Sequence, residues 1–498
     1  MTRFVVDMSA PDAGPFRKPF LQCVGSGHAA TALRDDWRRQ MRLCRQEIGF
    51  PFVRFHGLLD DDMSVCLAAP DPADSADPPA TGVEHSFHNV DSVFDFLLDI
   101  GMKPFVELSF MPGALASGTT TAFHYRANVT PPRDPDQWRD LVSALVRHVV
   151  DRYGGAEVRQ WRFEVWNEPN LDYFWTGSKQ DYFELYAAAA RAVKDVDPAI
   201  PVGGPATARN EWIPDMVRFC SSRGVALDFV STHHYPTDAA VQRDAADTGS
   251  VSFPRGVLAD MARAARSQAG ALPLHYTEWN SSPSSRDPLH DDPFAAAFLV
   301  KSALDVADVV DTYAWWAFSD IFEELGFPSE PFHGGFGLLS IHGVRKPSYR
   351  AFQLLARLLP RRVVVHAEPA GGSLECTATR DGDGLALLLS HHEPPGVAGA
   401  PATALVEVRG FHGKAEAAVF RVDEDHANPA RTWRDLGCPA YPDHKTMDRL
   451  HDASRPGQQL ITGSVDGATA RFEVPVPVHS VALVVLGPAA GLNAGRLF

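Results

Sequence analysis

The chain has 498 residues, of which 45% are hydrophobic and 22% are charged. This is the composition of a globular protein with a sizeable core, and the length allows a large barrel domain plus a smaller second domain. The formal net charge of −16 argues against binding to nucleic acid or to anionic membranes, and it leaves the oligomeric state open.

The N-terminal segment 2–10 reads TRFVVDMSA, a short β-type run. It lacks the apolar stretch of a secretory signal, because Asp7 interrupts it early. No run of about 18 apolar residues occurs in the sequence, so we expect no transmembrane helix and a cytoplasmic location. The segment could instead add a strand to a sheet formed by the C-terminal part of the chain.

From residue 20 onward, apolar β-type runs alternate with helical patterns, which is the signature of βα units around a parallel sheet. We predict strands at 20–26, 52–57, 103–110, 160–170, 200–206, 227–235, 272–280 and 311–320. We predict the helices that follow them at 32–47, 90–101, 136–153, 180–196, 211–223, 254–268, 294–308 and 346–358. Eight such units predict a closed (β/α)8 TIM barrel, in which the βα loops and the active site lie at the C-terminal face.

After about residue 360 the pattern changes to short β-type runs that are separated by turns rich in Gly, Pro and Asp. The runs lie at 361–368, 374–390, 403–410, 414–423 and 478–486. They predict an antiparallel β-sandwich. We therefore expect a barrel domain at 14–358 and a β-sandwich accessory domain built from 1–13 and 359–498.

Two of the predicted barrel strands end in a glutamate that lies beside aromatic and amide residues. Glu168 stands in WNEPN, and Glu278 stands in TEWN, on the opposite side of the barrel. Cleavage of a glycosidic bond needs one protonated and one ionised carboxyl group, and Asn167 could bind the 2-hydroxyl of the sugar. We expect the charge of Glu278 to raise the pKa of Glu168. Glu107 and Glu164 lie inside their strands and are expected to form ion pairs in the barrel interior.

Residues at the ends of two further strands fit a sugar pocket. Arg54 could keep Glu278 ionised, because a nearby cation lowers the pKa of a carboxyl group, although an ion pair in the barrel wall is an equal alternative. His233, His234 and Tyr235 end the sixth strand, and Tyr235 could donate a hydrogen bond to Glu278. One of the two histidines is expected to be a core residue. A metal site at the pair lacks a third ligand with suitable spacing.

The last predicted strand ends in Trp315 and Trp316, and Glu323 and Glu324 follow in the next loop. Aromatic rings stack on the apolar faces of sugars, so one tryptophan is expected to form the floor of a pocket and the other to pack in the core. The two glutamates are either a solvated acidic pair or acceptors for sugar hydroxyl groups.

Seven segments together resemble family 39 of the glycoside hydrolases, and within it the bacterial β-xylosidases. They read VRFHGLL, KPFVELSFMPGALASG, FHYRANVTPPRDP, FEVWNEPNLDYFWTG, VGGPATA, DFVSTHHYPTD and TEWNSSPS. The resemblance covers about residues 14–358 and fades in the C-terminal sandwich. It is specific because the neighbouring strings match as well as the Asn-Glu pair, which alone marks only a broader clan of retaining barrel hydrolases.

The resemblance implies a retaining, exo-acting β-xylosidase that removes xylose from the non-reducing ends of xylo-oligosaccharides. It implies that Glu168 is the general acid/base and Glu278 the nucleophile, and the position of Arg54 described above gives this arginine a supporting role. It also implies a set of substrate contacts: His56, Phe123, Asn167, His233, Tyr235, Trp316, Glu323 and Glu324. No cofactor and no metal ion are expected.

Several alternatives remain open at this level. Activity as a β-glucosidase, α-L-arabinosidase or α-L-iduronidase would use the same pair of glutamates. A sugar-binding module that kept the barrel without catalysis is a second class, and the two glutamates with their Asn, Tyr and Trp neighbours argue against it. A structural protein whose functional part is the sandwich is a third class.

Overall fold

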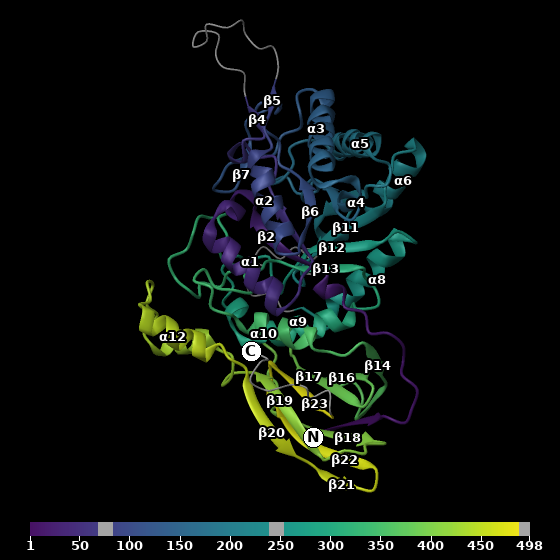
Figure 1. Cartoon of the computed structure of the whole chain (residues 1–498), viewed down its shortest axis with the longest axis vertical. Coiled ribbons are helices and arrows are strands. Elements are labelled where there is room, and N and C mark those ends of the chain that lie inside the picture. Colours follow the sequence, from purple (N-terminus) through teal and green to yellow (C-terminus); the bar gives the residue numbers. More distant parts are fainter. Residues whose placement is uncertain (68–82, 239–252, 488–498) are drawn as a thin grey trace, which may run out of the picture.

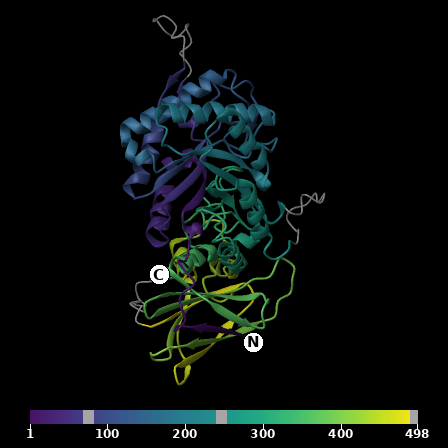
Figure 2. The same ribbon diagram turned by 90° about the vertical axis from the view of Figure 1, so that its right-hand side faces the viewer.

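The computed structural model describes residues 1–67, 83–238 and 253–487. They form a barrel surrounded by helices, with a β-sandwich beneath it (Figure 1). The two parts lie end to end along the long axis of the molecule, as the turned view also shows (Figure 2).

The barrel has eight parallel strands and is closed by the pairing of Trp315 with Val24. Each predicted strand is present, and the order around the barrel follows the order along the chain. The strands are β2 (Cys23–His28), β3 (Phe52–His56), β6 (Lys103–Leu108), β9 (Arg162–Val165), β10 (Val202–Thr207), β11 (Phe229–His234), β12 (Leu274–Trp279) and β13 (Thr312–Trp315). The prediction of a (β/α)8 barrel is therefore confirmed.

The helices that cover the barrel also follow the predicted pattern. Local sequence fixes several of their ends: the Asp134 side chain accepts from the Asp136 N–H, and Ser178 and Asp181 form a capping box. The main covering helices are α1 (Asp35–Glu47), α2 (His88–Asp99), α3 (Pro135–Tyr153), α5 (Lys179–Val196), α6 (Ile213–Arg223), α8 (Val257–Ala269), α9 (Pro293–Asp305) and α10 (Pro347–Ala356).

Short elements decorate the loops between these units. They are the helical turn α4 (Gly155–Val158), the hairpins β4 (Cys66–Leu67) with β5 (Glu84–His85) and β7 (Thr121–Ala122) with β8 (Ala127–Asn128), and the 3-10 turns η1 (Pro19–Leu21), η2 (Ala29–Leu33), η3 (Asp61–Met63), η4 (Ala208–Asn210) and η5 (Pro288–Asp291). Among the described residues, no helix is both long and apolar enough to cross a lipid bilayer.

The sandwich has two sheets, ordered β15-β1-β18-β22-β21 and β14-β16-β17-β23-β19-β20. The N-terminal strand pairs parallel with β18 and antiparallel with β15, so the first residues of the chain do join the C-terminal sheet, although one pair is not antiparallel. The strands are β1 (Thr2–Asp7), β14 (Arg361–Val363), β15 (Val365–Glu368), β16 (Leu374–Asp381), β17 (Gly384–His391), β18 (Ala402–Arg409), β19 (Glu416–Val422), β20 (Gly457–Thr462), β21 (Ser464–Asp466), β22 (Thr469–Val476) and β23 (Ser480–Leu486).

Two helices interrupt the sandwich between β19 and β20, and the sequence analysis missed them. They are α11 (Pro429–Asp435) and α12 (His444–Ala453). Ala430 and Trp433 of α11 and Leu450 of α12 anchor the inner faces, in a small cluster with Phe332 and Val344. The helical period was obscured because the remaining positions of α12 are mostly charged or polar.

Candidate active site

Glu168 lies in a turn directly after β9 at the C-terminal face of the barrel. The turn is unusual, because Trp166 and Glu168 both have positive φ angles of 71° and 45°. Neighbouring groups hold it in this strained conformation: the Glu168 N–H donates to the Ala206 carbonyl at 2.8 Å, and the buried indole of Trp166 donates to the Phe174 carbonyl at 2.9 Å. Backbone strain is thus concentrated at this carboxyl group.

Glu278 lies within β12, and His233 brings the two glutamates into one cluster. One carboxyl oxygen of each glutamate and a ring nitrogen of His233 all lie within 4.8 Å of one another. His233 Nδ1 is 2.9 Å from Glu168 Oε1 and 3.7 Å from Glu278 Oε2. Retaining glycosidases separate their carboxyl groups by about 5–5.5 Å and inverting ones by about 6.5–9.5 Å. The short separation here is that of a retaining pair.

Two groups contact the Glu278 carboxyl group directly. Tyr235 Oη donates to Glu278 Oε1 at 2.5 Å, and Arg54 Nη1 lies 3.5 Å from Oε2. Burial raises the pKa of Glu278, while the charge of Arg54 acts to lower it. Arg54 therefore favours the ionised form, as its position in the sequence predicted, but it does not outweigh burial.

Arg54 is fully buried and links several acidic residues inside the barrel. Its Nε lies 2.7 Å from Glu164, and its Nη2 lies 2.8 Å from Glu107. The same Nη2 donates to Asn167 Oδ1 at 2.9 Å. The predicted interior ion pairs of Glu107 and Glu164 are confirmed by these contacts. This network fixes the Asn167 side chain through its oxygen. Among the described residues, no protein group accepts a hydrogen bond from the Asn167 NH2 group.

Glu168 has the electrostatic character of a general acid. Burial raises the pKa of this carboxyl group to about 7, and the charges of His56 and Arg54 act against that rise. The sequence analysis attributed the rise to the charge of Glu278, whereas burial is the larger cause. A pKa near neutral pH allows one group to donate a proton in one step and to accept one in the next.

A chain of hydrogen bonds determines which nitrogen of His233 carries its hydrogen. Thr277 Oγ1 donates to Glu164 Oε1 at 2.8 Å, so its oxygen can only accept from His233 Nε2, which is 3.1 Å away. Burial lowers the pKa of His233 to about 4, so the ring is neutral and its Nδ1 has a free lone pair. That lone pair accepts a hydrogen from Glu168 Oε1, and the arrangement stabilises the protonated acid.

This arrangement makes the pH profile sensitive to Thr277. In the wild type, kcat/KM should fall above about pH 7, where Glu168 loses its proton. Thr277→Val removes the acceptor, so the hydrogen can move to Nδ1 and stabilise the ionised form of Glu168. We expect the alkaline limb to move down by about one pH unit, because about 1.4 kcal/mol corresponds to one pKa unit. Thr277→Ser keeps the hydroxyl and should leave the limb in place; an unchanged limb in the valine variant would exclude this role.

The glutamates open into a cavity of about 370 Å³ at the mouth of the barrel. Trp316 lies along its wall and its ring is 4.7 Å from that of His56. Gly25 makes room for this tryptophan, because a Cβ at that position would lie 2.6 Å from Trp316 Cε3. Eight of the residues expected at the site line the cavity: His56, Phe123, Asn167, Glu168, Tyr235, Glu278, Trp316 and Glu324.

The adjacent acidic residues Glu323 and Glu324 have different surroundings. Glu324 lines the cavity, and burial, together with the charges of Glu278 and Glu168, raises its pKa well above the usual value. The raised pKa favours the protonated form of Glu324, in which the carboxyl group can donate to a sugar hydroxyl as well as accept. Glu323 does not line the cavity but contacts His28 Nδ1 at 2.6 Å. Of the two glutamates expected as sugar acceptors, only Glu324 lines the cavity.

The adjacent histidines also have different surroundings. His234 Nε2 lies 2.7 Å from Tyr313 Oη, and the ring is fully buried, so His234 is the expected core residue. Trp315 is likewise buried and packs edge-on against Trp279. In the described part of the chain, His233 is grouped with the two glutamates and not with His234.

Sequence reasoning missed several residues of the cavity. Asp238 Oδ2 accepts from the Tyr235 N–H at 2.7 Å, and burial raises the pKa of its carboxyl group to about 7. Arg209 lines the cavity and brings a positively charged side chain to its wall, and its backbone has a φ of 63°. Tyr173 lies at the rim, with 52% of its surface exposed. Asp238 stands in the string HYPTD and could have been found there, whereas nothing in the local pattern marked Arg209.

Comparisons with known proteins agree with this geometry. The family model described as glycosyl hydrolases family 39 matches residues 5–469. A β-xylosidase from Caldicellulosiruptor saccharolyticus is 47% identical over 95% of this chain and 96% of its own, and one from Geobacillus stearothermophilus is 37% identical over 90% and 89%. The crystal structure of a monomeric β-xylosidase from Caulobacter crescentus CB15 superposes with a TM-score of 0.84 at 30% identity and covers 98% of this chain and 99% of that one. The chain belongs to glycosyl hydrolase family 39.

Proposed function

We propose that the chain is a retaining β-xylosidase that releases xylose from the non-reducing ends of xylo-oligosaccharides. The observation that carries the proposal is the pair Glu168 and Glu278, with carboxyl oxygens within 4.8 Å of one another at the bottom of a cavity. The choice of xylose as the substrate sugar rests on the β-xylosidases among the relatives of the chain.

The reaction proceeds in two displacements. In the first, Glu278 attacks the anomeric carbon and the bond to the leaving oxygen breaks, while Glu168 gives its proton to that oxygen. In the second, ionised Glu168 takes a proton from water, the water oxygen attacks the same carbon, and the bond to Glu278 breaks. The first step needs Glu168 protonated and Glu278 ionised. Tyr235 and Arg54 support the ionised form of Glu278 through their contacts.

The surroundings of Trp316 favour a walled pocket over an open groove. Phe322 packs edge-on against Trp316 with ring centroids 5.8 Å apart, and Phe336 lines the cavity. Two further phenylalanines that follow Trp316 in the sequence, Phe318 and Phe327, do not contribute to these walls. Phe318 is buried against Trp37, and Phe327 lies under the guanidinium of Arg34, so neither lines the cavity.

A panel of aryl glycosides tests the choice of sugar. We expect kcat/KM for a β-xyloside to exceed that for the β-glucoside by at least about 100-fold, or about 2.7 kcal/mol, because a closed pocket has no space for the added hydroxymethyl group. An α-L-arabinopyranoside should fall between the two. A xyloside-to-glucoside ratio near unity would contradict the walled pocket. Preferred cleavage of an α-L-iduronide would show that the enzyme is an α-L-iduronidase instead. Efficient internal cleavage of xylan would exclude an exo-acting enzyme.

We further propose that residues 14–358 form the catalytic unit and that 1–13 and 359–498 form the accessory sandwich. The pairing of β1 with β15 and β18 supports this division, because it ties the N-terminus to the accessory sheet. All the cavity-lining residues lie within 14–358.

A further inference from the structure

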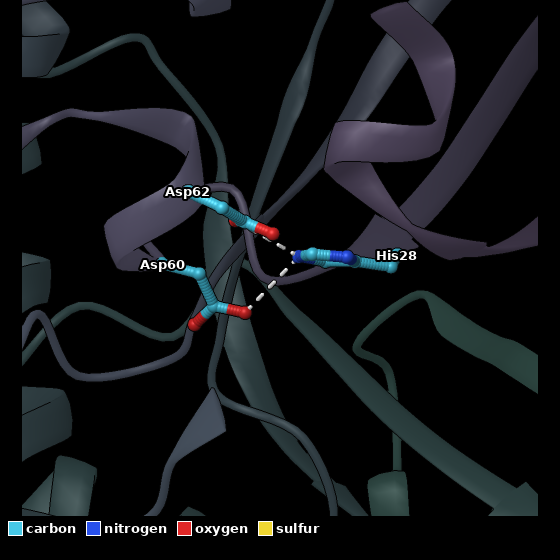
Figure 3. A group of neighbouring side chains, drawn as sticks. All are labelled: His28, Asp60 and Asp62. Atoms are coloured by element: carbon cyan, nitrogen blue, oxygen red, sulfur yellow. Dashed lines mark ion pairs between the residues drawn. The ribbon is translucent and has the colours of Figure 1, made fainter. Parts of the chain in front are cut away.

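A second cluster of polar side chains lies outside the catalytic cavity. His28, at the end of β2, faces Asp60 and Asp62 of the loop that follows β3 (Figure 3). His28 Nε2 is 3.3 Å from Asp60 Oδ2 and 3.2 Å from Asp62 Oδ1. One atom of each residue lies within 4.8 Å of the others. Neither catalytic glutamate belongs to this group.

The geometry of these contacts leaves buried atoms without hydrogen bonds. The His28 side chain is fully buried, yet neither carboxylate is aligned to accept a hydrogen from Nε2. Asp60 Oδ2 also lacks a hydrogen bond among the described residues. Buried polar atoms without a partner are rare and costly, so a nitrogen and an oxygen that face each other in this state indicate a missing third party.

The other nitrogen of His28 has the partner that a metal-bound histidine requires. Nδ1 lies 2.6 Å from Glu323 Oε1, and because a carboxylate only accepts, Nδ1 carries the hydrogen. This leaves Nε2 as the nitrogen with a lone pair. A histidine that binds a metal through one nitrogen usually donates from the other to a carboxylate, which fixes the ring. The ring of Tyr125 stacks on His28 at 3.7 Å and restricts it further.

The spacing of the three atoms also fits a metal ion. Ligands that lie about 2.0–2.2 Å from one ion at tetrahedral or octahedral angles are about 3–3.5 Å apart, as Nε2 is from each carboxylate. Asp60 Oδ1 accepts from the Phe110 N–H at 3.2 Å, which orients its other oxygen. Gly57 leaves the room for this approach, because a Cβ there would collide with Asp60 Oδ2. The side chain of Asp62 is 45% exposed and provides a path for an ion and for water ligands.

The charge of the cluster favours a cation. The two nitrogens of His28 face three carboxyl groups, at 3.3 Å and 3.2 Å from Nε2 and at 2.6 Å from Nδ1. The carboxyl groups of Asp60, Asp62 and Glu323 thus surround a single imidazole. A proton on Nε2 is one way to meet this negative potential, but it aligns with neither oxygen. A divalent ion would contact all three ligand atoms at once.

We propose that His28, Asp60 and Asp62 bind one divalent transition-metal ion, such as Mn²⁺ or Zn²⁺, which fastens the mouth of the barrel. The mixture of one imidazole and two carboxylates suits these ions better than Ca²⁺, which prefers oxygen ligands only. The ion would join the end of β2, the loop after β3 and, through the bond from His28 to Glu323, the loop after β13. That last loop also carries Glu324 of the cavity.

Metal titration of the full chain, after treatment with a chelator, tests the proposal. We expect the wild type to bind one Mn²⁺, measured by electron paramagnetic resonance, and one Zn²⁺, measured by calorimetry, with a rise in Tm. Asp62→Asn removes one charged ligand at an exposed position and should weaken binding at least about tenfold and abolish the rise in Tm. Asp61→Asn makes the same change at the adjacent residue and should bind as the wild type does.

Four outcomes would overturn the proposal or its choice of ion. The first is that the wild type binds neither ion, which would leave a proton on His28 as the only occupant of the site. Asp62→Asn and Asp61→Asn would weaken binding equally, which would show a general effect of surface charge. Binding would disappear in Glu278→Ala, which would place the ion at the glutamate cluster of the active site. Tighter binding of Ca²⁺ than of Mn²⁺ would overturn the assignment of the ion's class.

Discussion

Glu278→Ala should lower kcat on every β-xyloside by at least about 10⁴-fold, or about 5.4 kcal/mol of transition-state stabilisation. The reason is geometric. Tyr235 Oη and Arg54 both address the Glu278 carboxyl group, so the charge that attacks the sugar is prepared at this position. Among the other carboxyl groups nearby, Glu107 and Glu164 are committed to Arg54, and Glu168 is suited to proton transfer. Burial raises the pKa of Glu324 and of Asp238, which disfavours the ionised form that a nucleophile needs. None can replace the nucleophile.

A 2-fluoro xylosyl inactivator provides the direct measurement. It should label the wild type once, and mass spectrometry should find the label on the peptide that contains Glu278. Label on Glu107, Glu164 or Glu168 would refute the assignment. Tyr235→Phe is the matched control, because it removes the hydrogen bond to Glu278 but keeps the carboxyl group. It should still be labelled, at a lower rate, and the circular dichroism of each variant shows whether the fold is kept.

The barrel could be read from the sequence because each unit repeats two strong local signals. Apolar β-type runs and amphipathic helical patterns alternate along the chain, and the observed elements lie at the predicted places. The helices α11 and α12 lack these signals, since they bury few apolar residues and depend on contacts such as Trp433 with Phe332 of the barrel. The parallel pairing of β1 with β18 is equally a matter of tertiary structure, because the sequence of a strand does not specify which way its neighbour runs.

The site was predictable where a residue type and its position at a strand end were sufficient. Glu168, Glu278 and Tyr235 are of this kind. The different contacts of Glu323, with His28, and of Glu324, with the cavity, could not be predicted, because the directions of adjacent side chains in a loop are set by the loops around them. The direction of the pKa shift of Glu168 was predicted, but its cause was not, because burial is the main cause and burial is a property of the folded molecule.

Glu168→Ala should separate the two halves of the reaction. A substrate with a poor leaving group, such as xylobiose, needs the proton, so its kcat/KM should fall by about 10²–10⁴-fold. Dinitrophenyl xyloside leaves without a proton, so its first step should survive. Its second step lacks the base, and the xylosyl-enzyme on Glu278 should accumulate as a burst of dinitrophenol followed by slow turnover. The absorbance of dinitrophenol at about 400 nm, followed over time, shows the burst directly.

Azide then tests the geometry of the intermediate. A small anion can enter the space left by the Glu168 side chain and attack the anomeric carbon without a general base. The attack comes from the face opposite to Glu278, so the product should be β-xylosyl azide, and turnover of dinitrophenyl xyloside should rise with azide concentration. In Glu278→Ala, azide can instead occupy the place of the nucleophile and displace dinitrophenol directly, so any product that depends on azide should be the α-azide. Formation of the α-azide by Glu168→Ala would mean that the roles of the two glutamates are exchanged, because azide would then have replaced the nucleophile and displaced the leaving group in a single step with inversion.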